Sequence, residues 1–294
     1  MKKKPFVMAL LTFGAIFVFF FLLVLVLGRI SSPSGSFTLG DKIGFVEVNG
    51  AILASEDIVE QLNAFREDDS IKGVVLRINS PGGGVSPSQE IYQEVKALAA
   101  AKPVVVSMAS VAASGGYYIA VPAHRILANP GSITGSIGVI MEFTNLQELF
   151  QKIGLKSQVV KSGQYKDIGS PFRPMSEVDR QLLQNLIGDV HEQFVTAVAE
   201  GRRLEVQQVR EIADGRIFTG RQAMESGLVD QLGGYQEAIR VTAELAGIEG
   251  EPKVVYPQRD KAALLEYFVQ ETTRLVRQSL KEDNVGLEFL WSAK

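Results

Sequence analysis

The chain has 294 residues, no cysteine, two histidines and a formal net charge of −3. The absence of cysteine excludes disulfides, thiol catalysis and thiolate metal sites, and two histidines leave only an Asp/Glu metal site formally open. Nucleic-acid binders usually carry a basic patch or stripe, which this charge balance does not suggest, so we expect no nucleic-acid partner. The length suffices for one large domain or two small ones.

The N-terminus has the pattern of a membrane anchor. Three lysines precede an uncharged apolar run from Phe6 to Leu27, which is long enough to cross a bilayer as a helix. A cleaved signal peptide would have a shorter apolar region, and the GRISSPSGS that follows matches a cleavage site poorly. Only Arg29 lies just after the run, so the positive-inside rule puts the N-terminus in the cytoplasm and the rest of the chain outside. We therefore predict a cytoplasmic basic segment at 1–5, a transmembrane anchor at 6–28 and a linker at 29–41.

Strand and helix patterns alternate from residue 42 onward. Continuous apolar runs typical of buried strands occur at 73–78 and 103–108, with shorter strand patterns at 43–48 and 125–129. Apolar residues have helical spacing in four regions: after residue 55, at about 86–101, at 176–201 and before residue 246. This order predicts an α/β domain at 42–250 with a mostly parallel sheet and flanking helices. A C-terminal tail at 251–294 ends near LEFLW, for which we expect a packing or interface role.

Ser114 stands in VAASGGYYIA, at the start of a predicted helix. The ordinary interpretation is a helix N-cap. The alternative is a nucleophile, because the helix start would bring the amide of Gly115 close to an oxygen that gains negative charge. A second glycine stretch, SPGGG at 80–84, follows a buried strand and is either an ordinary turn or a backbone that exposes N–H groups to a ligand. Together the two stretches could supply the converging amides of an oxyanion hole.

A nucleophilic serine needs a general base. His124, which we expect at the far end of the same short helix, and His191, within the long helix, are both badly placed. A lysine can serve only if its pKa falls by roughly 3 units from about 10.4, which requires a water-poor pocket. The stretch at 160–174 offers Lys161 and Lys166, and their spacing does not choose between them. An ordinary solvated surface loop is the other interpretation of this stretch.

The stretches SPGGG, ASVAASGGYYIA, GSITGSIGV and SGQYKDIGSPF occur in this order, and with them the chain resembles the short, single-domain form of bacterial signal peptide peptidase A. That family consists of membrane-anchored Ser/Lys peptidases with a crotonase/Clp-like fold, and the resemblance covers about 42–246. Carried over by position, it implies Ser114 as nucleophile, Lys166 rather than Lys161 as general base, Ser136 as the residue that orients the lysine, and the backbone amides of Gly83 and Gly115 as the oxyanion hole.

The resemblance also implies a function. It is that of a serine endopeptidase that degrades remnant signal peptides and other apolar peptides at the outer face of the cytoplasmic membrane, as a ring- or dome-shaped homo-oligomer and without a metal or cofactor. One alternative is a related membrane-anchored peptidase of the same clan that acts on other membrane proteins. A second is an acyl-CoA hydratase or isomerase, which would need glutamates beside the glycine run. The third is an inactive membrane-tethered scaffold, which would be expected to lack Ser114 or Lys166.

Overall fold

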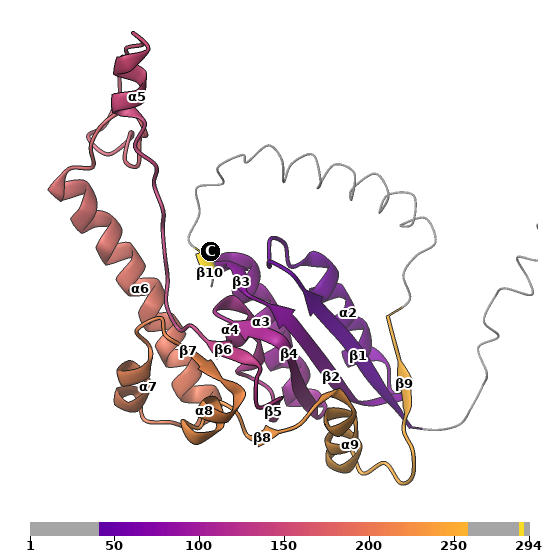
Figure 1. Cartoon of the computed structure of the whole chain (residues 1–294). Coiled ribbons are helices and arrows are strands. Elements are labelled where there is room, and N and C mark those ends of the chain that lie inside the picture. The colour runs from indigo at the N-terminus through magenta and orange to yellow at the C-terminus, as the bar shows by residue number, and fades with distance from the viewer. Residues whose placement is uncertain (1–40, 258–287, 291–294) are drawn as a thin grey trace, which may run out of the picture. The chain divides into compact units, whose positions relative to one another are not determined.

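The computed structural model describes residues 41–257 and the backbone of 288–290 (Figure 1). The predicted basic segment and anchor, nearly all of the linker and most of the tail therefore lie outside the described residues. Within the described part, no helix is long and apolar enough to cross a membrane.

One sheet forms the centre of the described domain, and its strand order is β7-β6-β4-β2-β1-β9, with β5 pairing with β4 and β8 pairing with β5. Neighbouring strands are parallel except β6 and β7, which confirms the predicted α/β class with a mostly parallel sheet. The strands of this sheet are β1 (Lys42–Asn49), β2 (Ile71–Ser80), β4 (Val104–Ala113), β5 (Arg125–Ala128), β6 (Ile133–Gly135), β7 (Ile217–Thr219), β8 (Gln231–Leu232) and β9 (Lys253–Val255).

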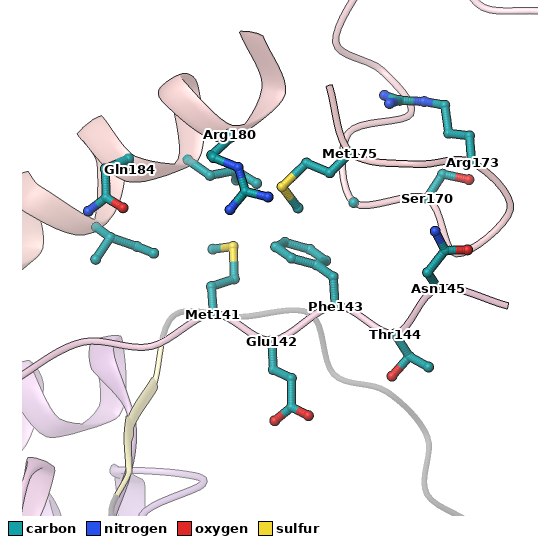
Figure 2. Close-up of a pocket in the computed structure, with 13 residues that line it drawn as sticks. Met141, Glu142, Phe143, Thr144, Asn145, Ser170, Arg173, Met175, Arg180 and Gln184 are labelled. Atoms are coloured by element: carbon teal, nitrogen blue, oxygen red, sulfur yellow. The ribbon is translucent and has the colours of Figure 1, made fainter. Parts of the chain in front are cut away.

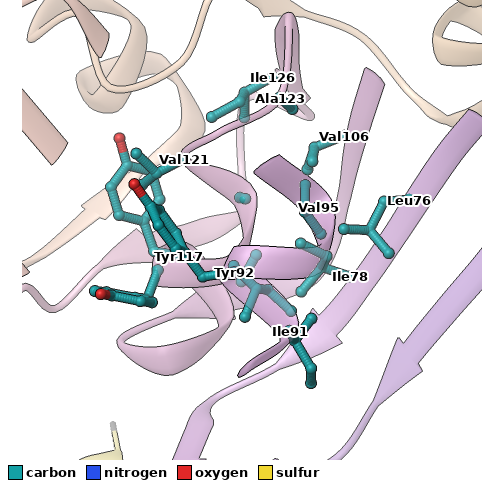
Figure 3. Packing of buried hydrophobic residues seen from close by; sticks show 14 of the residues in the cluster. Leu76, Ile78, Ile91, Tyr92, Val95, Val106, Tyr117, Val121, Ala123 and Ile126 are labelled. Carbon is teal, nitrogen blue, oxygen red and sulfur yellow. The ribbon is translucent and has the colours of Figure 1, made fainter. Parts of the chain in front are cut away.

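Helices cover both faces of this sheet. Successive strand residues face opposite sides, so Val74 and Leu76 join the larger core cluster, whereas Val75 between them joins a second cluster with α9. The larger cluster draws side chains from α2, α3, α4 and α6. Figure 3 shows part of it, with Ile91, Tyr92 and Val95 of α3 near Tyr117 of α4. The helices are α2 (Glu56–Glu67), α3 (Val85–Ala101), α4 (Gly115–Ala120), α5 (Gln147–Lys152), α6 (Glu177–Arg202), α7 (Val206–Ile212), α8 (Gly220–Glu225) and α9 (Tyr235–Leu245).

The structure differs from the sequence-based expectations in five places. The glycine run is an extended strand, β3 (Gly82–Gly84), and β6 lies within a stretch expected to be a loop. The short helices α5 and α7 were not predicted. His124 is not at the end of the short helix, because α4 ends at Ala120; its Nδ1 accepts a hydrogen bond from the Val104 N–H at 3.1 Å. Nε2 of His191 lies 2.7 Å from the Ala213 carbonyl oxygen, so both histidines are engaged with backbone groups.

Helix α6 begins as predicted, with a capping box. The Ser176 hydroxyl accepts a hydrogen bond from the Asp179 N–H, and the Asp179 carboxylate accepts one from the Ser176 N–H, each at 3.1 Å. Near its C-terminal end, α6 is fastened to the domain by Phe194, which is 0% exposed and whose ring centroid lies 4.9 Å from that of Tyr118 in α4. One end of α6 is therefore fixed against the helix that follows Ser114.

Replacing Phe194 by alanine is expected to lower the free energy of unfolding by about 3–5 kcal/mol, the usual cost of deleting a fully buried aromatic ring. Urea unfolding of the full chain in detergent, followed by circular dichroism, measures this. Thr196→Ala is the matched control, since Thr196 is an exposed residue of the same helix, and its effect should stay within about 0.5 kcal/mol. A loss below about 1 kcal/mol for Phe194→Ala would contradict the packing role.

Candidate active site

Ser114 joins the end of β4 to the start of α4 in a strained backbone conformation. Its φ is 53° and its ψ is −119°, a region that residues with a side chain rarely adopt. Hydrogen bonds fix the backbone on both sides: the Ser114 N–H donates to the Gly135 carbonyl at 2.8 Å, and the Ser114 carbonyl accepts from the N–H groups of Tyr117 and Tyr118. Such strain persists only where the surroundings impose it, and it concentrates at functional sites.

The Ser114 side chain does not cap the helix. The residue occupies the N-cap position of α4, but its hydroxyl makes no capping hydrogen bond. The side chain is buried, with 1% of the residue exposed, and its Oγ has no hydrogen-bond partner among the described residues. An unpaired buried hydroxyl costs about 1–3 kcal/mol. The ordinary interpretation of Ser114 as a side-chain N-cap is therefore wrong, and its hydroxyl is left available to another group.

The glycine strand β3 lies beside Ser114 and has the N–H and carbonyl of Gly83 on one edge. Gly84 donates its N–H to the Ile52 carbonyl, and the Ile52 N–H donates to the Gly82 carbonyl, both at 2.9 Å. Polar backbone groups alternate sides along a strand, so the N–H and carbonyl of Gly83 face away from Ile52. A Cβ placed on Gly115 would lie 3.2 Å from the Gly83 nitrogen. The two glycines predicted to form the oxyanion hole are thus close neighbours.

The C-terminal strand β10 (Glu288–Leu290) takes the free edge of β3. It pairs antiparallel with β3, with Phe289 opposite Gly83. The expected packing segment is therefore a backbone strand laid along the glycines next to Ser114. Beyond the apolar character of LEFLW, nothing in the sequence signals this pairing, because strand pairing across some 200 residues leaves no local pattern.

Ser136 lies directly across from Ser114. It follows Gly135, which pairs with Ala113 in neighbouring strands, and its N–H donates to the Arg216 carbonyl at 2.8 Å. Its φ is 51°, so Ser136, like Ser114, has the positive φ that residues with a side chain rarely adopt. Ser136 is only 7% exposed. The fold brings together four of the five predicted site residues: Ser114, Ser136, Gly83 and Gly115.

The fifth residue, Lys166, lies elsewhere, in the segment between α5 and α6. Its neighbour Lys161 is committed to other groups, because its Nζ lies 2.6 Å from Oδ1 of Asp167 and 2.9 Å from the Gln164 carbonyl oxygen. Within the described chain the Lys166 amine has no such partner, and the residue is exposed. The expectation that this lysine sits in a water-poor pocket is therefore wrong for the single chain.

The separation between Lys166 and Ser114 follows from the length of α6. The segment 160–174, called the lysine loop below, contains Lys166. Arg173 in this loop is hydrogen-bonded to Asp167 of the same loop and to Asp179 in the first turn of α6. From Asp179 to Phe194, which touches α4, the 15 residues correspond to about 22 Å at 1.5 Å per residue. Figure 1 shows the chain between α5 and α6 at the end of α6 opposite to α4. No lysine side chain bridges that distance, so one chain does not assemble Lys166 with Ser114.

A cavity of about 470 Å³ lies beside the lysine loop (Figure 2). It is lined by the segment 141–145, by 169–175 and by the N-terminal half of α6, and sequence reasoning did not anticipate it. Its walls are mixed, with apolar side chains from Met141, Phe143 and Met175 and two guanidinium groups from Arg173 and Arg180. Phe143 also packs closely on Gly169, where a Cβ would lie 2.3 Å from its ring, so the lysine loop is held against a defined support.

Comparison with known proteins gives two family matches. The profile of "Peptidase family S49" matches residues 96–249, and that of "Clp protease" matches residues 37–132. The chain is 44% identical to a Synechocystis sp. protein named "Putative protease", over 84% of this chain and 88% of that protein. It is 40% identical to "Putative signal peptide peptidase SppA" of Enterococcus faecium, over 63% of this chain and 54% of that protein.

A further relative is "Protease 4" of Salmonella typhi, which is 36% identical over 83% of this chain and 40% of its own length. The chain thus spans about half, or less, of the length of these last two relatives. Among solved structures, a ClpP1 mutant from Listeria monocytogenes aligns with a TM-score of 0.46 and 18% identity, over 66% of this chain and 93% of that one. The two family profiles together span the glycine strand, Ser114 and the lysine loop.

Proposed function

The chain belongs to peptidase family S49 and is a serine endopeptidase, and on that premise we propose that Ser114 and Lys166 are its catalytic dyad. The observation that carries this proposal is the state of Ser114: a buried hydroxyl without a partner, on a strained backbone, next to the amide of Gly115 and the edge of Gly83. The preference for Lys166 over Lys161 rests on the ion pair that occupies Lys161.

The chemistry follows from these groups. The neutral amine of Lys166, oriented by the Ser136 hydroxyl, removes the proton from Ser114 Oγ, which attacks a peptide carbonyl carbon. The amides of Gly83 and Gly115 stabilise the oxyanion. The lysine then passes its proton to the departing amine, leaving an acyl-enzyme. Water, deprotonated by the same lysine, attacks the ester carbonyl. The lysine then returns this proton to Ser114 Oγ as the ester bond breaks, which releases the acid and regenerates both groups.

Because one chain keeps the two residues apart, we infer that the dyad forms between two copies. The lysine of one copy would enter the site of its neighbour, where burial against the second chain supplies the water-poor surroundings that lower the pKa of a lysine. The surface that carries Lys166 is rich in exposed apolar side chains, as subunit interfaces often are. They are Ile140, Leu149, Ile153, Leu155, Val159, Val160, Tyr165, Phe172, Val178, Leu182 and Leu186.

The proposed substrate is an extended apolar peptide near the membrane. A peptide that adds to the Gly83 edge as a strand would present its carbonyl to Ser114, and β10 already uses this edge for an extended backbone. The apolar run at 6–28 would hold the domain of residues 42–250 at the outer face of the cytoplasmic membrane. Remnant signal peptides fit this description, in line with the name of the Enterococcus faecium relative.

Covalent labelling tests the dyad. A peptidyl phosphonate that reacts with activated serines should modify Ser114, as identified by peptide mapping of the labelled chain. Lys166→Ala should slow labelling at least roughly 100-fold, because the serine then lacks its base. Lys156→Ala, an exposed lysine of the same segment, is the matched control and should label at the wild-type rate. Labelling of another serine, or an unchanged rate in Lys166→Ala, would overturn the proposed dyad.

A further inference from the structure

Arg173 is the centre of an ion network directly beside Lys166. Its Nε lies 2.9 Å from Oδ2 of Asp167, and its Nη2 lies 3.0 Å from Oδ1 of Asp167 and 3.1 Å from the Asp167 carbonyl oxygen. Its Nη1 lies 2.5 Å from Oδ2 of Asp179. The guanidinium thus grips both the side chain and the backbone of the residue after Lys166, in the bidentate geometry that gives arginine its orientational specificity.

This network fastens the lysine loop to a rigid element. Asp179 belongs to the first turn of α6, where its carboxylate also completes the capping box. Its side chain is only 5% exposed, and hydrogen bonds from Arg173 and Ser176 lower its pKa to about 2. The Lys166 turn, closed by the hydrogen bond from the Lys166 N–H to the Gly163 carbonyl, is therefore connected through a single arginine to a helix of 26 residues.

The same network sets the charge on Asp167, the residue that follows Lys166 in the chain. Hydrogen bonds from Arg173 and Lys161 hold the pKa of Asp167 well below its usual range, so this carboxylate stays ionised. An ionised carboxylate beside a lysine favours the protonated amine, which is the wrong state for a general base. Arg173 and Lys161 offset this negative charge. The other charged groups around the cavity and the first turn of α6 are Glu142, Glu177, Asp179 and Arg180.

We propose that Arg173 is a positioning residue for Lys166, which it serves by fastening the lysine turn to α6 and by compensating the carboxylate of Asp167. The proposal rests on the Ser114–Lys166 dyad proposed above and adds a residue that contacts neither the substrate nor Ser114. Figure 2 shows Arg173 beside Ser170 at the edge of the cavity, on the loop that the arginine organises.

The test is the pH dependence of peptide hydrolysis by the full chain. In Arg173→Gln, the acid limb of the kcat profile should move up by about one pH unit, because Asp167 is then only half compensated and Lys166 holds its proton more tightly. At the wild-type optimum, kcat should fall about tenfold or more through misplacement of the lysine, with KM changed much less. Arg173→Lys keeps the positive charge but lacks the bidentate geometry of the guanidinium. It should therefore return the acid limb to the wild-type position but recover only part of the wild-type kcat.

A second variant separates charge from structure. Adding Asp167→Asn to Arg173→Gln removes the uncompensated carboxylate, so the acid limb should return toward that of the wild type while kcat remains low. Arg180→Gln, on the same cavity wall, is the control and should leave the limb in place. A merely structural arginine would lower kcat without moving the limb. An unmoved limb in folded Arg173→Gln overturns this proposal, whereas labelling away from Ser114 overturns the dyad itself.

Discussion

Co-expressing Ser114→Ala and Lys166→Ala chains in equal amounts should restore about one quarter of the wild-type activity, although each variant alone loses roughly 1,000-fold or more. The reason is the length of α6, which separates the lysine loop from α4 in the same chain by about 22 Å along the helix, from Asp179 to Phe194. If each site takes its serine from one copy and its lysine from another, random mixing gives one site in four both intact groups.

The measurement is the hydrolysis rate of an apolar peptide by purified mixed oligomers, with native mass spectrometry to verify that both variants are present. The control replaces the Lys166→Ala chain with the Ser114→Ala/Lys166→Ala double variant, which supplies no intact serine and must stay inactive. Mixed oligomers that remain inactive would show that the dyad forms within one chain. That result would also require the lysine loop to leave the position in which Arg173 and Asp179 hold it.

The sequence predicts well the parts of this fold that follow from local pattern. Val74, Val75 and Leu76 form a continuous apolar run, and they are buried because helices cover both faces of a parallel sheet. The start of α6 was readable from Ser176 and Asp179, since a capping box is a local signal. The extended conformation of Gly82–Gly84 was not readable, because it depends on pairing with Ile52 and Phe289, which lie far away in the chain.

The candidate site divides in the same way. Ser114 could be located because strand, glycines and helix follow one another in the sequence, but its φ of 53° and its unpaired hydroxyl result from contacts with Gly135 and α4. The expectation for Lys166 was wrong for the single chain. The apolar spacing of the long helix predicts that it forms, but does not reveal that its first turn lies away from the sheet. The role of Arg173 was equally hidden, since an exposed-looking charge in a loop has no pattern that reveals its partners.

Removing the C-terminal strand is expected to increase peptidase activity. A chain that ends at Gly286 lacks β10, which pairs with the Gly83 edge where we propose that substrates bind. A tethered strand competes at a high effective concentration, and a bias of about 1.4 kcal/mol toward the occupied edge suppresses binding tenfold. We therefore expect kcat/KM for a short apolar peptide to rise about tenfold in the truncated chain, mainly through a lower KM.

A substitution tests whether the backbone of β10 is what blocks substrate binding at the Gly83 edge. Because the N–H and carbonyl of Gly83 face β10 and Phe289 lies opposite, Phe289→Pro removes the N–H that would donate to the Gly83 carbonyl, and it should activate the enzyme nearly as much as truncation. Phe289→Ala keeps that N–H and is the matched control, with activation well below that of Phe289→Pro.

The synthetic peptide GLEFLW should inhibit the truncated chain competitively and bind to its Ser114→Ala variant. A truncated chain with lower activity than the wild type would instead make β10 a supporting strand of the site, because β3 would then need it to hold Gly83 in place beside Gly115.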